Sequence, residues 1–350
     1  MLFCSQTLKS ATNPFLRLQP SMSSRDPAMS TVEQPVWLDK TFLETSLRSE
    51  YGNTLRVAKY GVTVATAKGD NYTSTMYRVT IETTSNKTFT VVIKNLIGSG
   101  VDGCMLRQSS AFVRETRMLN VMLPRLAALL RDAIPAEPFG ARYIFSTDGV
   151  IIMEDLTPLG FRMVNRGVGL DLAHCLVVMR RLATFHAASV ILYQQDPECM
   201  TPFLESLFSE SVNEKQFQQM ISGLMKRVRV EVETWPDFSH FARKLRALEK
   251  DVLGRMCRGM RRDDKAFNVL NHGDAWKNNM LFRYSDTGQP ESVIFVDYQL
   301  SHLTSPAVDL RKFIYTSPTE DVRMRHENTL LQVRAQKACS NTAFVARILN

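Results

Sequence analysis

Apolar positions recur with two different periods along the chain, and the change of period separates an early sheet-forming part from a later helical part. Residues 38–51 place apolar side chains at helical spacing, which predicts a short amphipathic helix. The segments 62–67, 76–82 and 88–93 are rich in β-branched residues and are separated by polar turns, which is typical of strands. Three strands in succession without helices between them favour an antiparallel sheet.

One long helix and one hairpin complete the first part of the chain. Residues 109–130 carry an apolar stripe at helical spacing and predict a helix. Strand character returns at 143–145 and 150–153, on either side of Asp148 and Gly149, a pair that signals a hairpin turn.

Helices dominate the second part, after a hinge expected between residues 154 and 167. The pattern predicts helices over 171–188, 203–208, 214–234 and 238–261. It predicts short strands over 280–282 and 293–296. We therefore expect an α+β chain with a disordered leader (1–36), an N-lobe of sheet and one long helix (37–155), a mostly helical C-lobe (156–332) and a divergent tail (333–350).

Composition narrows the class of protein. The 350 residues are 44% hydrophobic and 22% charged, which is ordinary for a soluble protein, and no uninterrupted apolar run of about 18 residues predicts a membrane span. The six cysteines form no Cys-x-x-Cys pair, so we expect a reducing, cytoplasmic compartment without structural zinc. The net charge of +8 raises nucleic-acid binding as an alternative, but the basic segments 226–229 and 255–262 lack the interleaved aromatics of a single-strand binder.

The leader has two interpretations. Residues 1–25 are basic and serine-containing and carry no acid, as transit peptides do. Pro14 and Pro20 interrupt any amphipathic helix there, which favours a disordered leader, and Met22 or Met29 are alternative starts.

Candidate chemistry concentrates between His272 and Asp297. Phosphoryl transfer needs metal ions at the phosphates, a carboxylate beside the attacking hydroxyl and fixed positive charge. Asp274 is placed to accept or orient a hydroxyl, while Asn279 and Asp297 offer oxygen ligands that suit magnesium. We group His272 with these catalytic residues, in the supporting role of holding the loop by hydrogen bonds. An isolated Asp-x4-Asn pattern is common in proteins. The interpretation therefore rests on the combination of this loop with the hairpin that follows it and with the second Asp.

The upstream strands offer the positive charge and a phosphate loop. Lys94 ends an apolar strand, which suits contact with phosphate, and Glu115 on the following long helix is the expected partner that holds it. Between two strands, Gly69, Asn71 and Ser74 belong to a loop whose backbone N–H groups are suited to phosphates. This loop is neither a Walker loop nor a Gly-x-Gly-x-x-Gly motif.

From about residue 37 to about residue 321, the sequence resembles the insect ecdysteroid kinase-like family, also called CHK kinase-like, related to choline kinases and aminoglycoside phosphotransferases. The motifs that carry the resemblance lie at 69–79, 92–94, 112–115, 153–156, 182–189, 272–279, 297–301 and 305–310.

The resemblance implies a protein-kinase-like bilobal fold, ATP and Mg2+ as cofactors, and a small-molecule alcohol as acceptor, either an ecdysteroid or a dietary or foreign compound. It makes Asp274 the catalytic base and Asn279 and Asp297 the magnesium ligands. It makes Lys94, held by Glu115, the phosphate contact.

The resemblance also assigns the remaining motif residues. Backbone groups of Met153, Glu154 and Asp155 are implied to hold adenine. We expect His186 to pack within its helix without a partner, and Asp309 to anchor a loop structurally.

Two departures from the family pattern stand out. Tyr298 occupies a position where the family usually has Phe. The familiar pattern stops near Leu331, and residues 333–350 carry no acid, so we expect a truncated C-lobe. An alternative hypothesis is therefore a non-catalytic protein that still binds nucleotide or steroid. Under either hypothesis we expect a monomer that binds neither nucleic acid nor membranes.

Overall fold

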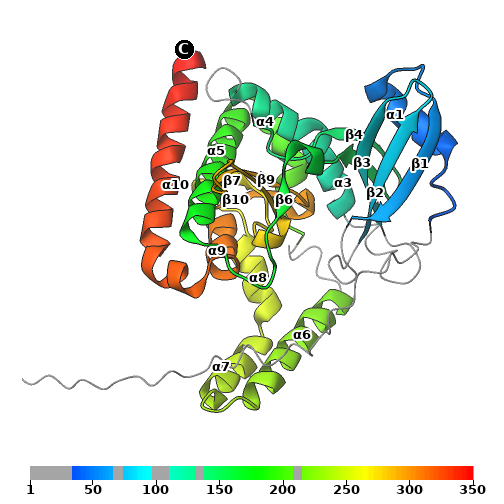
Figure 1. Cartoon of the computed structure of the whole chain (residues 1–350). Helices are drawn as coiled ribbons and strands as arrows, with labels where there is room; N and C mark the ends of the chain where they lie inside the picture. The colour runs from blue at the N-terminus through cyan, green and yellow to red at the C-terminus, as the bar shows by residue number, and fades with distance from the viewer. Residues whose placement is uncertain (1–33, 66–73, 97–109, 131–136, 208–214, 350) are drawn as a thin grey trace, which may run out of the picture.

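The computed structural model describes residues 34–65, 74–96, 110–130, 137–207 and 215–349, and places them in two lobes (Figure 1). The N-lobe is a sheet with helices beside it, and the C-lobe is mostly helical. This confirms the predicted α+β bilobal architecture. Almost all of the expected leader lies outside the described residues.

The N-lobe sheet is antiparallel and five-stranded, in the order β1-β2-β3-β5-β4. Its strands are β1 (Val57–Val64), β2 (Ser74–Thr83), β3 (Thr88–Leu96), β4 (Tyr143–Thr147) and β5 (Val150–Glu154). Gly149 adopts a φ of 75° in the turn between β4 and β5, a conformation that favours glycine. The sequence therefore placed the hairpin and the sheet correctly, and missed mainly the early start of β1.

Helix α1 (Lys40–Tyr51) covers one side of this sheet. The Asp39 carboxylate caps it by accepting a 2.7 Å hydrogen bond from the Phe42 N–H. Leu43 and Leu47, one turn apart, are completely buried in the N-lobe core together with Ile93 of β3. The N-lobe core thus fixes the strand that carries Lys94.

The predicted helix over 109–130 is one path with three geometries: α3 (Ser110–Arg117), a π-helical turn (Met118–Met122) and α4 (Leu123–Leu130). In the π-helical turn, the Leu123 N–H bonds the Met118 carbonyl, one residue further back than in an α-helix. Pro124 has no N–H to bond the Asn120 carbonyl, so the regular ladder is interrupted at this point. The turn separates α3, which packs against the segment Tyr298–Leu300 and reaches Lys94 of the N-lobe through Glu115, from α4, which packs on α5.

The C-lobe is built around α5, whose 24 residues are largely buried. Its helices are α5 (Leu172–Gln195), α6 (Lys215–Glu233), α7 (Ser239–Glu249), α8 (Val252–Met260), α9 (Ala307–Thr316) and α10 (Glu320–Leu349). Helix α5 is long and apolar enough to cross a membrane, but 72% of that window is buried inside the protein. It is the central helix of the C-lobe core. Helices α6 and α7 form a hairpin that extends from this lobe (Figure 1).

Short strands position the loops between the lobes. The hairpin of β8 (Met280–Tyr284) and β9 (Pro290–Phe295) is joined by β6 (Arg162–Met163), while β7 (Val269–Asn271) pairs with β10 (His302–Thr304). Short 3-10 helices lie at Thr157–Leu159, Pro197–Phe203, Lys277–Asn279 and Tyr298–Leu300. The predicted strands 280–282 and 293–296 are confirmed, whereas β6, β7 and β10 are too short to give a pattern.

Two helix predictions in the C-lobe were wrong. Residues 204–207 are not helical, because the helical turn lies earlier, at Pro197–Phe203, where Pro202 favours a short 3-10 segment over an extended α-helix. The predicted helix 238–261 breaks between α7 and α8. At the break, Asp251 has a non-helical φ of −138° and its carboxylate pairs with Arg258 at 2.6 Å.

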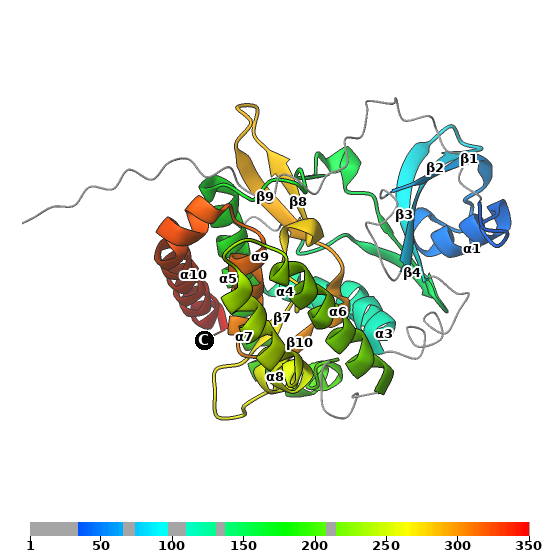
Figure 2. The same cartoon turned by 90° about the horizontal axis from the view of Figure 1, so that it is seen from below.

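Helix α10 continues without interruption across the expected boundary at residue 333. It packs along α5 on the side of the C-lobe remote from the N-lobe sheet (Figure 2). Leu330, on the α10 face toward α5, is completely buried in the C-lobe core. The backbone therefore shows no separate tail at this position.

Candidate active site

A buried lysine joins the two lobes at the centre of the molecule. Lys94 Nζ of β3 lies 2.6 Å from Glu115 Oε2 of α3 and 2.7 Å from Asp297 Oδ1, which follows β9. Lys94 is 4% exposed and Glu115 is 3% exposed. Three residues that the sequence predicted to act together are therefore in direct contact.

The two carboxylates stabilise the charge of Lys94, whereas burial raises the pKa of Glu115. Burial acts to lower the pKa of Lys94, but the neighbouring carboxylates of Asp297 and Glu115 outweigh burial and raise that pKa. The lysine therefore remains positively charged at neutral pH. A buried, permanently charged ammonium that also reaches a partly exposed carboxylate is suited to binding phosphate oxygens.

Helix α3 is fixed to the C-lobe by a second contact. The buried Arg114, which precedes Glu115, donates from Nη1 to the Ser301 carbonyl at 2.8 Å. The Ser301 hydroxyl in turn donates to the His272 carbonyl at 3.3 Å. Glu115 is thus held in place both from the sheet and from the loop of residues 272–279, which we call the catalytic loop.

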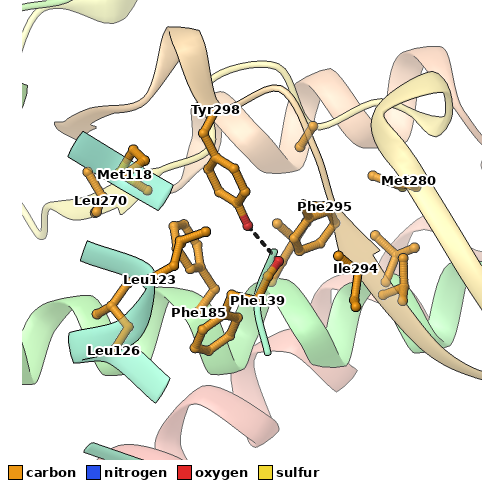
Figure 3. Packing of buried hydrophobic residues seen from close by; sticks show 14 of the residues in the cluster. Met118, Leu123, Leu126, Phe139, Phe185, Leu270, Met280, Ile294, Phe295 and Tyr298 are labelled. Atoms are coloured by element: carbon orange, nitrogen blue, oxygen red, sulfur yellow. Dashed lines mark hydrogen bonds between the residues drawn. The ribbon is translucent and has the colours of Figure 1, made fainter. Parts of the chain in front are cut away.

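Tyr298, directly after Asp297, anchors the loop in the C-lobe core (Figure 3). Its ring is completely buried beside Phe185, and its hydroxyl donates to the Phe139 carbonyl at 2.8 Å. Tyr298 therefore makes a hydrogen bond that a Phe at this position would lack. Asp297 itself adopts a left-handed φ of 67°, a strained conformation of the kind found at functional sites.

The catalytic loop is held from beneath by Asp309. Its completely buried carboxylate accepts one hydrogen bond from the His272 N–H and one from the Gly273 N–H, both at 2.8 Å. Gly273 has a φ of 84°, and an added Cβ would overlap the Leu300 backbone, so only glycine fits. The expected structural role of Asp309 agrees with this geometry.

His272 supports the loop and has no exposed surface. The Asp274 N–H donates to its Nδ1 at 3.2 Å, so the proton of a neutral ring is on Nε2, which donates to the Val296 carbonyl at 3.0 Å. Both ring nitrogens are occupied within the protein. The geometry therefore places His272 as a positioning residue that links the catalytic loop to β9, and not as a proton carrier.

The carboxylate of Asp274 lies between two polar partners. Its Oδ2 accepts from Asn279 Nδ2 at 3.0 Å, and Asn279 Nδ2 also lies 3.1 Å from the Asp274 carbonyl. Its Oδ1 pairs with Lys312 Nζ of α9 at 3.0 Å. Sequence reasoning did not single out Lys312, because a lysine in the amphipathic helix α9 gives no signal of its contact with a distant loop.

Asn279 and Asp297 fit the requirements of magnesium. The Asp297 carboxylate accepts from Lys94 and, at 3.3 Å, from Gln299 Nε2, which leaves lone pairs for a cation. The Asn279 amide turns its nitrogen to Asp274, which leaves its oxygen for a ligand. No group of three His, Cys, Asp or Glu side chains within the described ranges is arranged for a metal. A two-residue oxygen site suits Mg2+, which keeps waters and binds substrate phosphates.

The predicted adenine-binding segment ends β5 at the hinge. The Glu154 N–H donates to the Arg142 carbonyl at 2.9 Å, so it is not available to a nucleotide. The Asp155 carboxylate pairs with Arg78 Nε of β2 at 2.8 Å and accepts from the Thr157 N–H. Burial acts to raise the pKa of Asp155, but these hydrogen bonds outweigh it and lower the pKa. The Asp155 side chain therefore holds the hinge to β2.

The remaining predicted nucleotide-binding residues divide into two groups. Ser74 is buried at the start of β2, where it pairs with Leu96, and Met153 is buried within β5 between β3 and β4. Gly69 and Asn71 lie outside the described residues. The described residues therefore include β1 and β2, the two strands that flank the loop predicted to bind phosphate.

The expectation that His186 has no partner was wrong. Its Nε2 lies 3.0 Å from Asp309 Oδ2, and its Nδ1 lies 3.2 Å from Arg334 Nη2 of α10. These partners could not be predicted from the sequence, because they lie far along the chain in α9 and α10. His186 thus belongs to the support of the catalytic loop.

A separate cavity of about 140 Å3 lies against α5 and β9. It is lined by Glu137, Arg181 and Ser292 among others, and it shares no residue with the Lys94, Asp274 and Asp297 cluster. The candidate active site is therefore the cluster between the lobes, where all of the predicted catalytic residues lie.

Comparison with known proteins gives one family. The model of the ecdysteroid kinase-like family matches residues 68–339, which include the N-lobe from β2 onwards, the catalytic loop and the first two thirds of α10. No curated protein matched the chain.

Proposed function

Because the chain belongs to the ecdysteroid kinase-like family, we propose that it transfers the γ-phosphoryl group of ATP to the hydroxyl group of a small-molecule alcohol. The observation that carries this proposal is the contact of Lys94 with both Glu115 and Asp297. This contact brings Lys94 of the N-lobe to the carboxylate of Asp297, which follows the hairpin of β8 and β9. Phosphoryl transfer requires a cation and a metal-binding carboxylate arranged in this way.

Each residue of the cluster has a role in this reaction. The acceptor oxygen forms a bond to the γ-phosphorus, and the bond from that phosphorus to the bridging oxygen breaks, with its electron pair leaving on ADP. Asp274 orients the acceptor hydroxyl and takes its proton. Lys94 binds phosphate oxygens, and Glu115 keeps Lys94 in position.

Asn279 and Asp297 hold magnesium in the proposed function. When bound, the ion would offset the negative charge that develops on the phosphate oxygens during transfer. The protein fixes both ligands beforehand: the Val296 N–H donates to the Asn279 carbonyl at 3.0 Å, and Lys94 holds the Asp297 carboxylate.

The acceptor class is an ecdysteroid or a dietary or foreign alcohol. Residues 193–230 supply the walls of the acceptor site in this proposal. Exposed apolar side chains in this range, Leu224 and Val228 of α6, are suited to an apolar acceptor.

The proposal also includes the cellular compartment and the binding partners of the protein. Cys175 and Cys199 are buried thiols outside any disulfide, which suits the reducing cytoplasm. The basic residues Arg255 and Arg258 pair with Asp251, and such pairing leaves less positive charge for nucleic acid. We propose a cytoplasmic monomer with no nucleic-acid or membrane partner.

The rival function is a protein that binds nucleotide or steroid without catalysis. Thermal-shift titrations with ATP and Mg2+, followed by mass spectrometry of a panel of steroid and dietary alcohols incubated with both, separate the two. A mass gain of one phosphate on an alcohol supports the kinase. Binding of nucleotide without any phosphorylated product across the panel supports the rival.

A further inference from the structure

Lys312 of α9 forms an ion pair with Asp274, the residue that takes the acceptor proton in the proposed function. Its Nζ pairs with Asp274 Oδ1 at 3.0 Å and lies 5.6 Å from the centre of the Trp276 ring. The Lys312 side chain is 40% exposed and that of Asp274 is 18% exposed. The pair therefore sits at the mouth of the site, whereas Lys94 is buried within it.

The two oxygens of Asp274 are not equivalent. Oδ2 is bound by the Asn279 amide, and Asn279 is 7% exposed, so this side faces the protein interior. Oδ1 is bound by Lys312 alone among the described residues. An acceptor hydroxyl that enters from solvent therefore meets Oδ1 and the Lys312 ammonium together.

We propose that Lys312 is a second catalytic lysine, which binds the phosphoryl group during its transfer from ATP to the acceptor. This inference rests on the proposed function. A hydroxyl bound to Oδ1 at a normal hydrogen-bond distance lies at most about 6 Å from Lys312 Nζ. The phosphorus that the hydroxyl oxygen attacks lies about 3 Å from that oxygen, a span that the flexible Lys312 side chain covers by turning towards it.

The charge balance of the step explains why a cation is useful at this point. As the acceptor oxygen bonds to phosphorus and the bond to ADP breaks, negative charge is spread over the three equatorial oxygens of the phosphoryl group. Lys94 and the metal ligands lie on the nucleotide side of this group. Lys312 supplies positive charge on the acceptor side, where a cation beside the developing negative charge lowers the barrier of the transfer.

The resting contact of Lys312 is suited to this exchange. A salt bridge that is two-fifths exposed on the lysine side contributes little to stability, so the ammonium is free to leave Asp274 when a phosphoryl oxygen becomes available. The Lys312 ammonium also lies over the Trp276 ring, a cation–π contact that favours its position beside the site.

The test measures binding of ADP and Mg2+ by calorimetry, with and without aluminium fluoride, a mimic of the planar phosphoryl group. We expect aluminium fluoride to tighten ADP binding by at least about 10-fold in the natural protein, as transition-state mimics do. Lys312→Met should lose about 10-fold or more of that gain while binding ADP alone within about 2-fold of the natural protein. Lys312→Arg, which keeps the charge, should recover part of the gain.

Arg311→Met is the matched control, because it removes one positive charge from the adjacent, exposed position of the same helix. Arg311→Met should retain the full tightening of ADP binding by aluminium fluoride. An equal gain in Lys312→Met and the natural protein, or no gain in the natural protein although it binds ADP, would overturn the role of Lys312. Absence of any ADP and Mg2+ binding by the natural protein would overturn the proposed function itself.

Discussion

His186 and Asp309, both completely buried, share a hydrogen bond of 3.0 Å that connects the central helix of the C-lobe to the catalytic loop. Arg334 donates to the other ring nitrogen of His186, so His186 is neutral and its Nε2 proton faces Asp309. Asp309 in turn holds the catalytic loop by accepting hydrogen bonds from the N–H groups of His272 and Gly273. The catalytic loop is therefore supported by α5, α9 and α10 together.

Replacing Asp309 by Asn tests this support. One oxygen becomes an NH2 group that faces a backbone N–H, so a buried donor loses its acceptor. We expect the free energy of unfolding to fall by about 1–3 kcal/mol and phosphoryl transfer to be largely lost. Urea denaturation followed by circular dichroism measures the first effect. Unchanged stability and unchanged transfer would show that the loop does not depend on Asp309.

The buried histidines predict a pH dependence of stability. Burial lowers the pKa of His186 and of His302 below the ordinary value near 6.5. Below that pH the unfolded chain binds protons that the folded protein does not. The free energy of unfolding should therefore be fully retained above about pH 6.5 and fall below it, by up to about 1.4 kcal/mol per pH unit for each histidine.

Urea titrations at a series of pH values from neutral to mildly acidic measure this slope. His186→Gln keeps a donor toward Asp309 but cannot be protonated, so the slope should become shallower in this variant. A stability that is flat or rises as the pH falls would contradict the burial of neutral histidines.

Tyr298→Phe removes the hydroxyl that donates to the Phe139 carbonyl. The Phe139 carbonyl keeps a longer hydrogen bond from the Phe295 N–H, at 3.3 Å, so we expect a loss of about 0.5–1.5 kcal/mol in the free energy of unfolding. Tyr315→Phe is the control, because Tyr315 is 54% exposed and should change stability little. Equal effects of the two substitutions would argue against the Tyr298 hydrogen bond.

Gly273→Ala combines a positive φ with overlap on the Leu300 backbone. We expect it to disrupt the catalytic loop, abolish transfer and lower the melting temperature. Gly223→Ala, in α6 where an added methyl group meets no atom within 4 Å, should stabilise the protein by about 0.5–1 kcal/mol. Normal transfer by Gly273→Ala in an activity assay would contradict the tight geometry described at this glycine.

The sequence predicted the sheet, its hairpin and the Lys94, Glu115 and Asp297 cluster. The strands alternate clearly, and the template of phosphoryl transfer demands a lysine, an acid to hold it and a metal-binding carboxylate in that order. The break between α7 and α8 escaped prediction because Asp251 is an ordinary residue in a continuous helical pattern. The π-helical turn escaped because Pro124 signals an interruption but not its geometry.

The support of the site was harder to predict than its chemistry. The contacts of Lys312 with Asp274, and of Arg334 with His186, join segments far apart in the chain, and a single sequence carries no signal for such pairs. His186 shows the consequence: taken alone it is a packing residue in α5, whereas its partners make it part of the loop support.

The most direct measurement of the central claim follows radiolabelled γ-phosphate from ATP to an alcohol acceptor, comparing the natural protein with Asp274→Ala and Asp297→Ala. The account predicts Mg2+-dependent transfer by the natural protein and a loss of at least about 10²-fold in each variant, because one removes the group that orients the acceptor and the other a metal ligand. Transfer that persists in both variants would contradict the account.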